Sequence, residues 1–87
     1  MADIYSLVLG QCYRVVRAFT DYDHREHPVG ESWEFVATNF LPYESGLTLH
    51  VRQGGHLLVY RLQWMPEAQA AILEHFTDYV TPCESPL

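Results

Sequence analysis

The middle of the chain alternates apolar and polar residues with a period of two. Between Trp33 and Leu62 this pattern predicts strands that bury one face in an antiparallel sheet. We expect strands at residues 12–19, 33–38, 47–52 and 56–64. Gly54 and Gly55 separate the last two and predict a tight hairpin, because a primed turn needs positive φ. Gly46 is expected to supply a left-handed position in the turn that starts at Pro42.

Helical patterns flank the predicted sheet. Asp3 is a suitable cap for a short helical turn within residues 1–10. After Pro66, apolar residues recur at three- and four-residue spacing as far as Tyr79, which predicts an amphipathic helix over residues 65–80. The segment 81–87 contains two prolines and is expected to be a loose tail.

These elements predict a single α+β domain over residues 1–87, with an N-terminal helical turn at 1–10, an antiparallel sheet at 11–64 and a helix at 65–80. We expect a small, strongly bent sheet of about four strands, an SH3-like and partly open barrel, covered by the C-terminal helix. A flatter meander with the helix across it is the alternative. In either arrangement Trp33, Leu49, Leu58 and Phe76 should meet in one core.

The charge and cysteine content narrow the classes of partner and compartment. Eleven acidic residues face five basic ones, a net charge of −6, so nucleic acid is not an expected partner. The sequence has no run of about 20 apolar residues, so we expect no membrane span. The first ten residues lack the pattern of a signal peptide. Cys12 and Cys83 are expected to be free thiols in a reducing cytoplasm, with a single bridge between them as the alternative.

The densest polar run lies between the first two predicted strands. It contains the ligand types that a divalent metal prefers, at Asp21, Asp23, His24, Glu26 and His27. The spacing matches no standard metal site, so we expect a solvated surface loop with no metal and no cofactor. The sequence contains no nucleophile elbow, no phosphate-binding glycine loop and no other catalytic motif. We therefore expect no catalytic residues and no enzymatic activity.

Exposed tyrosines give the predicted partner surface. Most of the large aromatic residues are expected to fill the core, namely Trp33, Phe35, Phe40, Tyr60, Trp64 and Phe76. Tyr22 and Tyr43 are harder to bury, and tyrosine is favoured at interfaces. The predicted partner-binding residues are Tyr22, Tyr43, Glu44, Asp21 and Asp23. The turn that carries Tyr43 and Glu44 is either a recognition tip or a structural corner.

Three segments carry a resemblance to a known family. They are His-Pro-Val-Gly-Glu-Ser-Trp-Glu-Phe at 27–35, Asn-Phe-Leu-Pro-Tyr-Glu-Ser-Gly-Leu at 39–47, and Arg-Leu-Gln-Trp at 61–64 with Pro-Glu-Ala-Gln at 66–69. From Tyr13 to Val80 the chain resembles a family of small bacterial proteins classed only as a domain of unknown function, with a Phe-Leu-Pro-Tyr-Glu signature. The resemblance implies a bacterial, cytoplasmic protein without an established activity, and it transfers no catalytic residue.

The function expected from these observations is a non-enzymatic protein-binding module of the inhibitor, immunity or adaptor type. Two alternatives remain. One is a small-ligand or metal-binding domain that uses His50, His56 or the 21–27 loop. The other is a homodimer or larger homo-oligomer. It would cover apolar residues on the parity opposite the core, namely Val16, Val36, Leu57 and Val59.

Overall fold

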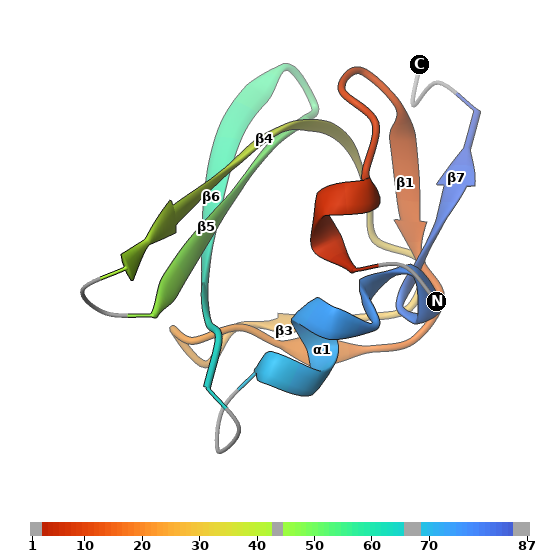
Figure 1. The fold of residues 1–87 in the computed structure, drawn as a ribbon. Helices are drawn as coiled ribbons and strands as arrows, with labels where there is room; N and C mark the ends of the chain where they lie inside the picture. Colours follow the sequence, from red (N-terminus) through yellow and green to blue (C-terminus); the bar gives the residue numbers. More distant parts are fainter. Residues whose placement is uncertain (1–2, 43–44, 66–68, 85–87) are drawn as a thin grey trace.

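A five-stranded antiparallel sheet dominates the computed structural model, which describes residues 3–42, 45–65 and 69–84 (Figure 1). The strand order is β6-β5-β4-β1-β7. These strands are β1 (Cys12–Val15), β4 (Ser32–Leu41), β5 (Gly46–Gln53), β6 (His56–Gln63) and β7 (Val80–Cys83). A separate two-stranded sheet pairs β2 (Phe19–Thr20) with β3 (Glu26–His27). The helical segments are η1 (Ile4–Ser6), α1 (Ala70–Glu74) and η3 (Phe76–Asp78).

The hairpin between β5 and β6 forms at the predicted place. Gly54 and Gly55 have φ values of 58° and 82°, and Gln53 faces His56 across the turn. The prediction for the preceding turn is wrong in one respect. Gly46 is already part of β5, and Ser45 takes the left-handed position with φ of 49°.

A β-bulge at Val36 reverses the alternation along β4. Before it, Trp33 and Phe35 point into the core. The register then shifts between Phe35 and Ala37, so that two residues of β4 oppose one step of β5. Beyond the bulge Phe40 lies opposite Leu47, whose side chain is buried. The bulge therefore brings Phe40, two positions after Thr38, onto the inner face of the sheet, at its far end.

The core lies between the sheet and the helical segments. Figure 1 shows β1 and β7 on one side, β5 and β6 on the other, and β4 connecting the two, with η1 in the space between them and α1 below η1. Trp33, Leu49 and Phe76 belong to one buried cluster, and Leu58 packs against it. The predicted meeting of these four residues is confirmed. On the opposite face Leu57 and Val59 are exposed, as their parity predicts.

The predicted SH3-like barrel with a C-terminal helix is wrong. The described residues form mostly sheet without a closed barrel, and α1 contains only five residues. The backbone leaves the helical conformation at His75, with φ of −124° and ψ of 36°. The short 3-10 helix η3 follows, and the chain then continues as β7, whose residues Val80–Cys83 pair with β1. The predicted loose tail is therefore a strand as far as Cys83. Val80 is buried because β7 pairs with β1, a strand far away in the sequence, and local residue spacing does not reveal such a partner.

The N-terminal part agrees better with the prediction. Asp3 caps η1, because its carboxylate accepts a hydrogen bond from the backbone N–H of Tyr5 at 3.0 Å. The expected strand at 12–19 is instead two short strands, β1 and β2, which belong to different sheets. Residues 16–18 lie between them, and the backbone N–H groups of Val16 and Arg17 bond to the carbonyl of Tyr79.

Candidate functional site

A buried cluster of charged side chains lies where the small sheet meets the large one. We call Asp21, His27 and Glu31 the buried triad. His27 Nε2 lies 2.9 Å from Asp21 Oδ2, and His27 Nδ1 lies 2.8 Å from Glu31 Oε1. Asp21 and His27 are each only 2% exposed. The expectation of a solvated loop is therefore wrong for both of these residues.

The loop between β2 and β3 is built around the Asp21 carboxylate. Its Oδ1 atom accepts hydrogen bonds from the backbone N–H groups of Asp23 at 2.9 Å and Arg25 at 3.0 Å. These contacts are typical of an aspartate that shapes its own turn. They leave Oδ2 directed at His27, so the loop itself fixes one side of the triad.

The geometry favours a doubly protonated His27. Both ring nitrogens face carboxylate oxygens, and only an imidazolium donates a hydrogen bond from each nitrogen. Burial by itself lowers the pKa of His27, but the hydrogen bonds to Glu31 and Asp21 outweigh this effect and the pKa is raised above its ordinary value. The triad is thus a positive charge held between two carboxylates.

Aromatic side chains surround the triad. The His27 ring stacks on Phe19 with centroids 4.7 Å apart and meets Tyr60 edge-on at 4.3 Å. Trp33 Nε1 donates a hydrogen bond to Glu31 Oε1 at 3.1 Å. Burial raises the pKa of the Tyr60 phenol. With its polar atoms engaged with one another, the triad has the character of a structural network that locks the β2–β3 hairpin to β4 and β6.

The structure describes three of the five predicted partner-binding residues, and it places them differently. Asp21 lies inside the protein, which removes it from an exposed surface in this structure. Tyr22 and Asp23 remain outside and gather on Arg61 of β6: the backbone N–H of Tyr22 bonds to the Arg61 carbonyl, and the Asp23 carboxylate pairs with the guanidinium. The hydrogen bond from Arg61 holds the pKa of Asp23 below its ordinary value. Tyr43 and Glu44 lie outside the described residues.

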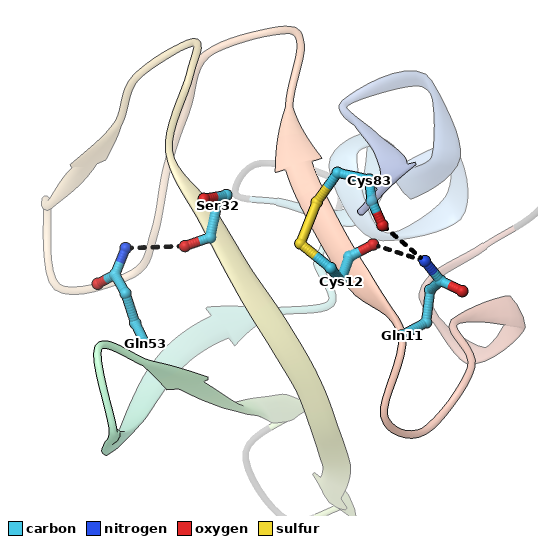
Figure 2. The surroundings of a disulfide bond; sticks show 5 residues. All are labelled: Gln11, Cys12, Ser32, Gln53 and Cys83. Atoms are coloured by element: carbon cyan, nitrogen blue, oxygen red, sulfur yellow. Dashed lines mark hydrogen bonds between the residues drawn. A yellow bond between two sulfur atoms is a disulfide. The ribbon is translucent and has the colours of Figure 1, made fainter. Parts of the chain in front are cut away.

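Cys12 and Cys83 form a disulfide between β1 and β7 (Figure 2). The expectation of free thiols is therefore wrong. The two residues face each other in the antiparallel register, with Cα atoms 5.1 Å apart, which is a normal distance for a bridge. Gln11 Nε2 donates to the carbonyls of both cysteines, as Figure 2 shows. The disulfide ties the C-terminal strand to the sheet.

Three aromatic side chains line an open depression on the surface. Tyr5, Phe40 and Trp64 line an open depression of about 300 Å³, and we call it the aromatic hollow. The rings of Tyr5 and Trp64 stack with centroids 5.7 Å apart and planes 20° apart. Tyr5 is 53% exposed and Phe40 is 42% exposed. The expectation that Phe40 fills the core is wrong, and Trp64 is only partly buried against it.

Two further features bear on the ligand-binding alternative. Among the described residues no group of three or more His, Cys, Asp or Glu side chains is arranged to hold a metal ion. A second open depression, of about 620 Å³, lies beside the disulfide and is lined in part by Arg14, Ser32 and Glu84. It does not include His50 or His56, where the sequence predicted a ligand site.

Comparisons with known proteins place the chain in a family. Residues 3–84 match the model of a family described as Domain of unknown function (DUF3601). The chain belongs to the DUF3601 family. This DUF3601 protein is also similar to a solved structure, an integron cassette protein from the mobile metagenome of Vibrio cholerae. The two share 36% sequence identity with a TM-score of 0.88, over 95% of this chain and 92% of the other.

The comparisons confirm the resemblance to a domain of unknown function, while the Phe-Leu-Pro-Tyr-Glu signature stays a prediction. A comparison with curated proteins found no match. Within the residues that the structure describes, no helix of this DUF3601 protein is long and apolar enough to cross a membrane.

Sequence reasoning missed the two most distinctive sites. Glu31 follows His27 by four residues, and this spacing was the only local signal for the buried triad. The aromatic hollow gave no local signal, because Tyr5, Phe40 and Trp64 come from three distant segments. Phe40 reaches it only through the bulge at Val36, which the alternation does not show.

Proposed function

We propose that this DUF3601 protein is a non-enzymatic, bacterial protein-binding module of the inhibitor, immunity or adaptor type, and that the aromatic hollow is its anchor site. The exposure of Tyr5 and Phe40 beside Trp64 carries the proposal. Aromatic side chains that converge on a depression are the kind of group that dominates binding energy at protein interfaces.

The distribution of charged chemistry supports a binding role. In the buried triad the two carboxylates and the imidazole hydrogen-bond to one another, and Asp21 also accepts hydrogen bonds from backbone N–H groups. The aromatic hollow, by contrast, leaves large ring surfaces open to solvent. The aromatic hollow is therefore better suited to docking a partner than to carrying out a reaction.

Affinity capture with matched variants tests the proposal. The immobilised wild-type protein should retain a stoichiometric protein partner from a lysate of its source cell. Phe40→Ala should lose that partner, because it removes one wall of the hollow, whereas Leu57→Ala on the opposite face should keep it. Thermal unfolding checks that both variants remain folded. The absence of any stoichiometric partner, or equal retention by Phe40→Ala, would refute the proposal.

Self-association is a second candidate, favoured by the outer edge of β6. The register from Gln53 and His56 directs alternate backbone groups towards β5, which leaves those of Leu57 and Val59 on the outer edge. Both side chains are also exposed. An exposed apolar edge strand is a template for pairing with a second copy. Light scattering at high protein concentration should then give the mass of a dimer, and a monomer mass would rule the pairing out.

The redox state of Cys12 and Cys83 in the cell indicates the compartment in which the protein resides. The sequence points to the cytoplasm, where thiols are normally reduced, whereas disulfides persist in oxidising compartments. Alkylation of free thiols in intact cells, followed by mass spectrometry, measures the state of Cys12 and Cys83 directly. We propose the cytoplasm if both thiols are alkylated, and an oxidising compartment if both are protected.

A further inference from the structure

The rings of the aromatic hollow leave part of their faces open. Aromatic pairs prefer offset or edge-to-face arrangements, with ring centroids about 4.5–7 Å apart, over full face-to-face overlap. The Tyr5 and Trp64 centroids are 5.7 Å apart, so the two rings overlap only in part. Phe40 adds a third ring from β4. The hollow therefore presents aromatic π surface from three distant segments of the chain.

A carboxylate lies at the edge of this surface. Glu74 of α1 accepts a hydrogen bond from Trp64 Nε1 at 3.1 Å, which holds its charge beside the indole ring. The faces of aromatic rings are also electron-rich and attract cations, with tryptophan the strongest of them. The whole chain carries a net charge of −6. The Glu74 carboxylate, the electron-rich ring faces and the net negative charge all favour a cationic group in the hollow and disfavour an anionic one.

We propose that the aromatic hollow binds an alkylammonium group, the side chain of a lysine or methylated lysine on a basic partner protein. Such a side chain has an apolar stem, which would lie along Phe40 and Tyr5, and a charged head, which would lie over the ring faces near Glu74. The inference rests on the proposed function and names the chemistry that the anchor site recognises. The chain itself contains no lysine, so its own side chains do not supply this group.

Three short peptides that differ at one residue test the inference. The central residue of Gly-Gly-Xaa-Gly-Gly is lysine, trimethyllysine or norleucine, and norleucine keeps an unbranched apolar stem without the charge. Binding is followed from the amide and indole N–H signals of ¹⁵N-labelled protein. At least one of the cationic peptides should bind about two- to fivefold more tightly than the norleucine peptide, the effect of one exposed cation–π contact. The trimethyllysine and lysine arms show which form of the cation is preferred.

Variants separate recognition in the hollow from general attraction to an acidic protein. Glu74→Gln should reduce the preference for the cationic peptides, and Phe40→Ala should weaken binding of all three. Glu34→Gln serves as the matched control. It removes the same charge from β4, where Glu34 forms an ion pair with Arg52 of β5. It should leave the preference unchanged.

Two results would overturn the inference. Equal binding of norleucine and the cationic peptides would show that the hollow recognises apolar stems, which leaves the binding-module proposal intact. A cationic preference that survives in Phe40→Ala and falls equally in Glu74→Gln and Glu34→Gln would assign it to the overall charge. The capture experiment tests the proposed function separately, because it does not depend on which chemical group the hollow recognises.

Discussion

Replacing His27 by leucine should strongly lower the stability of the fold, because it removes the only cation of the buried triad. Asp21 Oδ2 and Glu31 Oε1 would each lose one charge-assisted hydrogen bond, at 2.9 and 2.8 Å. A hydrogen bond to a charged group contributes about 1.5–3 kcal/mol, and breaking a buried ion pair costs about 3–5 kcal/mol. We therefore expect His27→Leu to lower the free energy of unfolding by about 3–5 kcal/mol.

Three remaining hydrogen bonds limit the loss of stability. Asp21 retains its two backbone hydrogen bonds, and Glu31 retains the one from Trp33. The loss is nevertheless a large part of the total, since domains of this size unfold with about 4–13 kcal/mol. It corresponds to a fall in melting temperature of roughly 12–40 °C.

Urea denaturation of the oxidised protein at pH 6, followed by tryptophan fluorescence, measures the effect. Trp33 is fully buried beside the triad and reports on its surroundings. The matched control is His56→Leu, the same substitution at an exposed position of β6. If the two variants lose equal stability, the ion pairs of His27 do not stabilise the fold.

Two further predictions concern pH and the disulfide. The raised pKa of folded His27 means that its stabilising contribution is complete below the unfolded pKa of about 6.5 and is lost as the pH rises through the folded value. The urea midpoint of the wild type should therefore fall across that window, and His27→Gln should lack this step; an identical pH profile would contradict the assignment. Replacing both Cys12 and Cys83 by alanine should lower stability by about 4 kcal/mol, because the bridge closes a loop with a sequence separation of 71 residues. Thermal melts of the double variant and of the oxidised wild type measure this difference, and equal melting temperatures would show that the bridge is dispensable.

The sequence predicted those parts of the fold in which neighbouring residues determine the structure. Alternation located β5 and β6, and Gly54 and Gly55 located their hairpin, because strand faces and positive φ are local properties. The turn at η1 was predicted from the Asp3 cap for the same reason. The helix over residues 65–80 was overpredicted, since three- and four-residue spacing is also compatible with a short helix followed by a strand.

The parts that were missed depend on distant partners. β7 exists because Val80 and its neighbours pair with β1, and the disulfide joins Cys83 to the same strand. Asp21 and His27 resemble surface residues in composition, but their charges neutralise each other inside the fold. The aromatic hollow combines three segments and depends on a bulge that moves Phe40 between faces. Apart from the four-residue spacing of His27 and Glu31, none of these properties has a local pattern in the sequence.

The bridge between Cys12 and Cys83 makes the intervening chain a covalent ring. A protease that cuts once inside this ring, for example after the exposed Arg25, therefore opens the ring without releasing a fragment. The two pieces would stay joined by the disulfide and by the pairing of β1 with β7. Denaturing electrophoresis would resolve them only after reduction. Nicking in this exposed loop thus converts the protein into a two-chain molecule whose halves stay together.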